Sequence, residues 1–153
     1  AFKAPEKRSN VIPSRRGYVV IDDTYNAGPA SVKSALKTLS MMDGDRKIAV
    51  LGDMLELGDH AIEAHLEIGR NLASGMGQSQ CGVDLLFAVG ELAKLIARGA
   101  IDAGMPISSV IEFEDSAQAA KEITSQVRER DVVLVKGSRA MKMERIVEAL
   151  LGA

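Results

Sequence analysis

Short apolar segments rich in β-branched residues alternate with helical periods along almost the whole of this chain. The apolar runs lie at residues 18–21, 48–51, 85–89 and 132–135, and residues 110–113, which include Glu112, are a weaker fifth candidate. Continuous runs of this kind are typical of strands that are buried on both faces of a sheet. Because parallel strands are joined by right-handed crossovers, the alternation predicts a doubly wound, mostly parallel sheet with helices on both faces.

The segments between these runs carry apolar residues three and four positions apart, which places each set on one face of a helix. The predicted buried stripes are Val32, Leu36 and Leu39; Ile62, Leu66, Leu72 and Ala73; Leu92, Leu95, Ile96 and Ala103; Ala120, Ile123 and Val127; and Met143, Ile146, Val147 and Leu150. Pro29 suits a first helical turn, and Asp115 with Gln118 resembles a capping box. The fold class that we expect is therefore α/β and Rossmann-like.

The length of 153 residues fits a single domain. Within it we expect two parts. Residues 1–16 form a leading segment with an antiparallel edge hairpin through Val11 and Ile12, and residues 17–153 form the α/β body. Residues 75–80 are expected to form a surface loop.

The composition excludes several classes of function. The net charge of -2, from 19 basic and 21 acidic residues, lacks the basic surface of a general nucleic-acid binder, and aromatic residues for base stacking are few. No run approaches the ~20 apolar residues of a membrane span, and residues 1–8 contain no signal-peptide segment. The single cysteine, Cys81, cannot form an internal disulfide, which favours a reducing compartment. We expect a cytoplasmic protein.

Polar loops follow four of the predicted strands, at residues 22–29, 52–58, 90–91 and 136–139. Ligands of doubly wound sheets bind beyond the carboxyl ends of the strands, where such loops converge. These loops are richer in Asp, Asn, Lys and Arg than turns that only reverse the chain. The sequence therefore predicts that the functional site lies at this edge.

The loop of Lys136, Gly137, Ser138 and Arg139 carries the sharpest signal for an anion. It is expected between a buried strand and a helix start, where free N–H groups and the helix dipole favour negative charge. Gly137 permits close backbone approach, Ser138 can cap the helix, and Arg139 can bind a carboxylate or phosphate in two-pronged fashion. The same residues also suit a capped helix whose basic groups pair with nearby carboxylates, and the pattern leaves both interpretations open.

Asp22 and Asp23 could accept hydrogen bonds from ribose hydroxyls or hold a metal through water, but they also suit a local turn. Adjacent residues of a strand point to opposite sides, so one of the two is expected to face a ligand. His60 and His65 do not share a helix face and have no Cys partner, so we expect no metal site. The chain contains neither a G-x-x-x-x-G-K-[ST] phosphate loop nor a nucleophile elbow.

Three of the loops, taken together, resemble those of the Mur ligases that add D-alanyl-D-alanine. Residues 22–29 (DDTYNAGP) resemble the family's D-D-[ST]-Y-N-A-N-P, and residues 51–58 (LGDMLELG) match its L-G-D-M-x-E-L-G. Residues 133–141 (VLVKGSRAM) match its closing segment. The motifs stand in the family's order and cover nearly the whole chain from about residue 17 onward. The chain is thus similar to the C-terminal domain of such a ligase.

The resemblance implies a three-domain, monomeric enzyme. Its N-terminal domain would bind the UDP-sugar peptide, its central ATPase domain would carry the phosphate loop, and this domain would close over the central one. With ATP and Mg²⁺ the family activates the carboxylate of UDP-MurNAc-tripeptide as an acyl phosphate. The amine of D-Ala-D-Ala then attacks it, which yields a peptidoglycan precursor. This domain alone would be inactive and would bind no cofactor.

The resemblance also implies roles for individual residues. On the nucleotide side it places Asp23 at the ribose, Tyr25 and Asn26 along the adenine and ribose, and Arg8 as a residue that reaches the nucleotide. On the substrate side it places Lys136, Gly137, Ser138 and Arg139 at the D-Ala-D-Ala carboxylate, and Asp53, Met54 and Glu56 along the cleft between domains. No catalytic or metal-binding residue is implied within this chain. Gly28 departs from the family, which often has Asn at this position.

Two interpretations of other classes remain open at this point. One is a freestanding module that binds a small anion or nucleotide without chemistry. The other is a flavodoxin-like nucleotide-binding regulator, which fits the fold but leaves the loops at residues 53–58 and 136–139 unexplained.

Overall fold

The computed structural model describes residues 10–73 and 82–153, so Arg8, Cys81 and the loop expected at residues 75–80 lie outside the described residues. The strands are β1 (Asn10–Pro13), β2 (Val19–Asp23), β3 (Arg46–Gly52), β4 (Leu85–Val89), β5 (Val110–Phe113) and β6 (Asp131–Lys136). The α-helices are α1 (Pro29–Ser40), α2 (Ala61–Leu72), α3 (Ala93–Asp102), α4 (Ser116–Glu122) and α5 (Glu144–Gly152). Short 3₁₀ turns are η2 (Gly58–His60), η3 (Ile107–Ser109), η4 (Ile123–Ser125) and η5 (Arg139–Met141).

The six strands form one sheet in the order β1-β2-β6-β3-β4-β5. All neighbouring pairs are parallel except β1 and β2, which form an antiparallel hairpin at the edge. In this hairpin Val11 is opposite Ile21 and Ile12 is opposite Val20. The predicted α/β class and edge hairpin are therefore confirmed. β6, the last strand in the sequence, lies between β2 and β3. It therefore joins the β1-β2 hairpin to the strands β3, β4 and β5.

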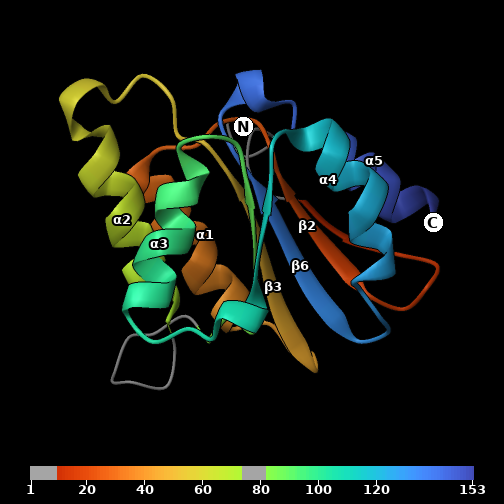
Figure 1. Ribbon diagram of the computed structural model, residues 1–153. Coiled ribbons are helices and arrows are strands. Elements are labelled where there is room, and N and C mark those ends of the chain that lie inside the picture. Colours follow the sequence, from red (N-terminus) through yellow and green to blue (C-terminus); the bar gives the residue numbers. More distant parts are fainter. Residues whose placement is uncertain (1–9, 74–81) are drawn as a thin grey trace, which may run out of the picture.

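Helices pack on both faces of the sheet, as Figure 1 shows: α1, α2 and α3 lie on one side, and α4 and α5 on the other. Strands β2 to β6 each contribute to both layers. In β3, Ala49 and Leu51 pack in the layer of α1 to α3, whereas Ile48 and Val50 pack in the layer of α4 and α5. This burial on both faces explains why the strand is a continuous apolar run. None of the helices in residues 10–73 and 82–153 has the length and apolar character needed to cross a bilayer.

The helix stripes are confirmed in part. In α5, Ile146, Val147 and Leu150 are buried, as is Met143 just before the helix, all as predicted. In α2 the prediction for Ile62 is wrong, because its side chain is 60% exposed. The buried face of α2 consists of His65, Ile68, Gly69 and Leu72. A Cβ on Gly69 would clash with the backbone carbonyl of Ile96 in α3, so the two helices approach each other through glycine rather than through large apolar side chains.

An ion pair joins β3 and β6 at their amino ends, opposite the candidate loops. Arg46 Nε donates to Asp131 Oδ1 at 2.9 Å, and Arg46 Nη2 donates to Asp131 Oδ2 at 2.7 Å. The Asp131 side chain is fully buried and also accepts the N–H of Arg128. The hydrogen bonds and the charge of Asp131 raise the pKa of the Arg46 guanidinium above its ordinary value, although burial opposes the shift. Two-pronged geometry of this kind fixes the register of neighbouring strands.

Candidate functional site

The loops that follow β2, β3 and β6 meet at the carboxyl edge of the sheet because these strands are neighbours. Two glycines allow the ends of β3 and β6 to approach closely. A Cβ on Gly137 would lie 3.1 Å from the Cα of Gly52 and 2.8 Å from Met143 Cγ. A Cβ on Gly52 would instead meet Met143 Sδ at 2.9 Å, with the Cα of Gly137 at an ordinary contact distance of 3.5 Å. Gly52 and Gly137, which belong to two distant motifs, therefore lie next to each other and against Met143.

Ser138 joins all three loops. Its Oγ accepts the N–H of Leu55 at 2.8 Å and lies 3.5 Å from the carbonyl oxygen of Ala27. The N–H of Ser138 donates to the carbonyl of Asp53 at 3.0 Å. Because Ser138 is only 6% exposed, these contacts replace water and hold the loops in one arrangement.

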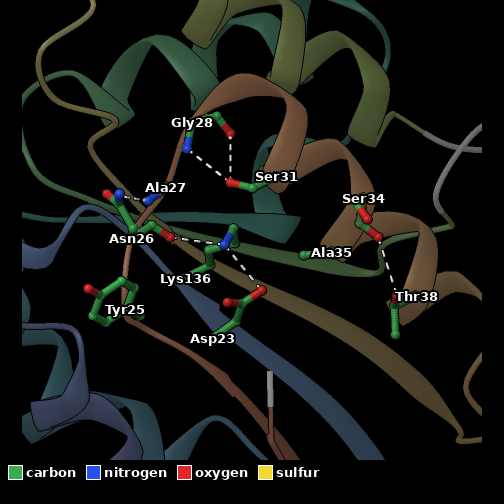
Figure 2. Close-up of a pocket in the computed structure, with 10 residues that line it drawn as sticks. All are labelled: Asp23, Tyr25, Asn26, Ala27, Gly28, Ser31, Ser34, Ala35, Thr38 and Lys136. Atoms are coloured by element: carbon green, nitrogen blue, oxygen red, sulfur yellow. Dashed lines mark hydrogen bonds and ion pairs between the residues drawn. The ribbon is translucent and has the colours of Figure 1, made fainter. Parts of the chain in front are cut away.

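Lys136 is buried beside Asp23. Its ammonium donates to the carbonyl oxygen of Asn26 at 2.9 Å and lies 3.1 Å from Asp23 Oδ2 (Figure 2). The Lys136 side chain is 3% exposed and that of Asp23 is 15% exposed. The two residues are also opposite each other in the register of β2 and β6. Asp23 is thus oriented by a fixed positive charge at the strand end.

A cavity of about 400 Å³ opens between the β2 loop and α1. It is lined by Asp23, Tyr25, Asn26, Ala27, Gly28, Ser31, Ser34, Ala35, Thr38 and Lys136 (Figure 2). We call it the first cavity. The hydroxyl residues of α1 were missed by sequence reasoning. Their spacing of three and four residues, on the helix that directly follows the β2 loop, is the signal that could have found them.

A second cavity has a volume of about 540 Å³ and shares one residue of the β2 loop with the first. It is lined by Asn26, Leu55, Glu56, Ser138, Arg139, Ala140, Lys142 and Glu144. Basic and acidic side chains thus share one wall, and Asn26 lines both cavities. Leu55, Lys142 and Glu144 were not among the predicted site residues. Lys142 and Glu56 both adopt left-handed backbone conformations, with φ of 55° and 65°.

Arg139 and Tyr25 connect the two cavities. The guanidinium carbon of Arg139 lies 4.6 Å from the centroid of the Tyr25 ring, within the range of a cation–π contact. Tyr25 lines the first cavity and Arg139 lines the second. Lys136, in contrast, lines the first cavity and is not in the wall that contains Arg139.

The β3 loop is fixed by its backbone and by one carboxylate. Asp53 Oδ1 accepts the N–H of Ala93 at 2.7 Å, at the start of α3. The N–H of Met54 donates to His65 Nε2 at 3.0 Å. Asp53 and Met54 are 7% and 1% exposed, so both lie inside the domain. Of the three residues predicted to line a cleft here, Glu56 lines the second cavity, and Asp53 and Met54 line neither the first nor the second.

The expected helix start directly after Ser138 is wrong. Residues Arg139–Met141 form a single 3₁₀ turn, Lys142 has a left-handed backbone, and the α-helix begins at Glu144. Ser138 makes no side-chain capping bond, since its Oγ is used by the β3 loop. The helix-dipole argument therefore does not apply, and the positive charge of the second cavity comes from Arg139 and Lys142 side chains.

The neighbouring aspartates divide as the strand geometry predicts. Asp22 Oδ1 accepts the N–H of Thr24 at 3.3 Å and its hydroxyl at 2.8 Å, which is a local turn. Asp23 faces the first cavity. In residues 10–73 and 82–153 no group of three or more His, Cys, Asp or Glu side chains could hold a metal ion.

Comparisons with known proteins agree with these motifs. Residues 7–139 match the family described as Mur ligase, glutamate ligase domain. The chain is 36% identical to the UDP-N-acetylmuramoyl-tripeptide--D-alanyl-D-alanine ligase of Bacillus subtilis, over 98% of this chain and 32% of that protein. It therefore spans about a third of the length of this relative.

Solved structures show the same similarity. MurF ligase from Thermotoga maritima in complex with ADP aligns with a TM-score of 0.74 and 30% identity, over 95% of this chain and 30% of that one. MurF from Acinetobacter baumannii aligns with a TM-score of 0.76 and 31% identity, over 94% of this chain and 30% of that one. On the match to the family, the fold and the three motifs, this chain belongs to the Mur ligase family and forms its glutamate ligase domain.

Proposed function

We propose that this chain is the C-terminal domain of an ATP-dependent ligase that adds D-Ala-D-Ala to UDP-MurNAc-tripeptide. The observation that carries the proposal is the pair of adjacent cavities with Asn26 in both walls. A ligase that proceeds through an acyl phosphate needs its nucleotide and its amine acceptor side by side. The similarity to ligases of this name supports the same assignment over the freestanding binding module.

The first cavity suits the nucleoside part of ATP. The Asp23 carboxylate, already oriented by Lys136, is a hydrogen-bond acceptor for ribose hydroxyls. Tyr25 is 44% exposed and offers a ring for contact with a base. Asn26 completes this wall, and Arg8, outside the described residues, is proposed to reach the nucleotide. The relative from Thermotoga maritima was solved in complex with ADP, which supports a nucleotide role for this family.

The second cavity suits a dipeptide zwitterion. D-Ala-D-Ala carries a carboxylate at one end and an ammonium group at the other. Arg139 can bind the carboxylate through two parallel N–H donors, with Lys142 as a second cation in the wall. Glu56 and Glu144 supply negative charge for the ammonium end. The loops around this cavity are held together by contacts of Ser138, Gly137, Asp53 and Met54.

The remaining machinery is assigned to other parts of the whole enzyme. We place the ATP phosphates, Mg²⁺ and the catalytic groups on a central ATPase domain, and the UDP-sugar peptide on an N-terminal domain. This domain would close over the central one and present D-Ala-D-Ala to the acyl phosphate. A chain of these 153 residues alone would then form no product. We also propose that the whole enzyme is cytoplasmic and monomeric. Its product would be a precursor of peptidoglycan.

The test uses Arg139→Ala in the full-length ligase. A carboxylate that loses this partner should raise the KM for D-Ala-D-Ala by about 30- to 150-fold, equivalent to about 2–3 kcal/mol. Because Arg139 contacts Tyr25 of the nucleotide cavity, the KM for ATP should move by no more than ~5-fold. Arg98→Ala is the matched control, since the Arg98 side chain is 72% exposed on α3 and away from both cavities. An unchanged KM for D-Ala-D-Ala in Arg139→Ala contradicts the proposal.

A further inference from the structure

His65 is a fully buried histidine whose two ring nitrogens both have partners. Nδ1 lies 2.6 Å from the carbonyl oxygen of Ala61, and Nε2 lies 3.0 Å from the backbone nitrogen of Met54. A carbonyl oxygen only accepts hydrogen bonds, so Nδ1 carries the proton. Nε2 then has a free lone pair and accepts the Met54 N–H. The two contacts together define one tautomer and one ring orientation.

This hydrogen bond ties the β3 loop to α2. The other bonds of the loop lead elsewhere: Asp53 contacts Ala93 of α3, and Leu55 contacts Ser138 of the β6 loop. Met54 is 1% exposed, so its N–H has no access to water and depends on His65 for a partner. An apolar residue at this position of α2 would fill the space but would leave a buried donor unsatisfied.

The hydrogen bond between His65 and Met54 also holds the backbone near Glu56, two positions beyond Met54. The φ of 65° at Glu56 lies in the left-handed region, which a residue with a side chain occupies only when its surroundings hold it there. Glu56 lies in the wall of the second cavity and is exposed. The bonds to Met54 and Leu55 hold the backbone immediately before Glu56, and so set the point from which its side chain enters the second cavity.

We infer that His65 is a positioning residue for the amine acceptor: it holds Met54, and through it Glu56, where the ammonium group of the incoming dipeptide binds. The inference rests on the proposed function for the second cavity. His65 itself lines neither cavity, and its hydrogen bond to the site goes to the backbone N–H of Met54. Its substitution should therefore affect the acceptor rather than the nucleotide.

Two amide variants separate the two bonds of His65 in the full-length ligase. His65→Asn places an amide near the position of Nδ1, where it can still reach Ala61, but is too short to reach Met54. His65→Gln extends to the position of Nε2 and can accept the Met54 N–H. An unsatisfied buried donor predicts a rise of about 5- to 100-fold in the KM for D-Ala-D-Ala for His65→Asn. His65→Gln should stay within ~3-fold of the unmodified ligase, because the acceptor is restored.

Hydrogen exchange measured by mass spectrometry gives a second readout that does not depend on activity. Peptides covering residues 53–57 should exchange faster in His65→Asn and near the original rate in His65→Gln. Ile68→Val is the control for a merely weakened core, because Ile68 lies on the same buried face of α2 without touching the loop bond. It should leave both the KM for D-Ala-D-Ala and the exchange of residues 53–57 unchanged.

The outcomes distinguish this inference from the proposed function. Faster exchange in His65→Asn with an unchanged KM for D-Ala-D-Ala overturns the positioning role, as does an equal effect of His65→Asn and His65→Gln on that KM. Equal rises in the KM for ATP and for the dipeptide also overturn it, since the defect would then be general. A failure of the proposed function appears separately, as an unaffected Arg139→Ala enzyme.

Discussion

The guanidinium of Arg139 lies over the ring of Tyr25, with its central carbon 4.6 Å from the ring centroid. Arg139 lines the second cavity and Tyr25 lines the first, so this contact joins the two cavities. The two residues come from opposite ends of the sequence and meet because β6 is the neighbour of β2. Because the Tyr25 ring lines the first cavity and contacts a residue of the second, one substitution can affect both the proposed nucleotide site and the proposed acceptor site.

Tyr25→Leu should therefore weaken the binding of both proposed substrates, D-Ala-D-Ala and ATP, in the full-length ligase. Loss of a partly exposed cation–π contact predicts a rise of about 2- to 5-fold in the KM for D-Ala-D-Ala. The KM for ATP should also rise, because the ring is removed from the first cavity. Tyr25→Phe keeps the ring and should show the smaller change of the two. Steady-state kinetics with each substrate varied in turn checks this, and a rise confined to ATP contradicts the shared role.

Asp23→Ala should lower the free energy of unfolding because it leaves the Lys136 ammonium buried without its counter-charge. We expect a loss of about 3 kcal/mol, at the low end for buried pairs, since the Asn26 carbonyl remains as a partner. Adding Lys136→Met removes the buried charge as well and should recover most of the loss. Urea unfolding of the single and double variants gives the comparison. A double variant no more stable than Asp23→Ala would show that the charge is not the cause.

Gly69→Ala should be strongly destabilising for a change of one methyl group. The added Cβ would clash with the Ile96 carbonyl, and backbone cannot rotate away as a side chain can. We expect a loss of about 2–3 kcal/mol, in the range for overpacked cores, despite the better helix propensity of alanine. Gly152→Ala in α5 is the matched control, because nothing lies within 4 Å of its Cβ position. Thermal unfolding should leave this control at or slightly above the original Tm.

Gly28→Asn should stabilise the domain. Gly28 is the N-cap of α1, with φ of -134° and no capping side chain, and its Cβ position is open. An asparagine there can accept an N–H of the first turn, so Gly28→Asn should exceed Gly28→Ala by about 1 kcal/mol in the free energy of unfolding. The alanine variant separates the cap from the loss of glycine flexibility. Equal stability of the two variants would mean that the side chain does not cap.

The sequence contained enough to predict the sheet, the edge hairpin and the layers, because runs of β-branched residues and helical spacing are local signals. On the buried face of α2 it predicted Leu72 correctly, but it missed His65 and Gly69 and wrongly included Ile62. That face depends on how closely α3 approaches and on the need of Met54 for an acceptor. Both are properties of the assembled fold rather than of the apolar pattern.

The site was predicted at the level of loops but not of pairings. That Lys136 binds Asp23 follows from β2 and β6 being neighbours in the sheet, which no local pattern indicates. The delayed start of α5 has a similar cause. Ser138, which suits a helix cap by residue type, uses its hydroxyl for Leu55 of another loop.

The position of β6 also bears on how the protein is made. β2 and β3 are not hydrogen-bonded to each other. Both pair with β6, which is synthesised after the other strands of this sheet. Until then the nascent chain has two open inner edges, and long-range pairings of this kind form slowly. The three loops come together only when Asp131–Lys136 is inserted. Translation that stops before β6 therefore leaves the inner edges of β2 and β3 unpaired and the three loops apart.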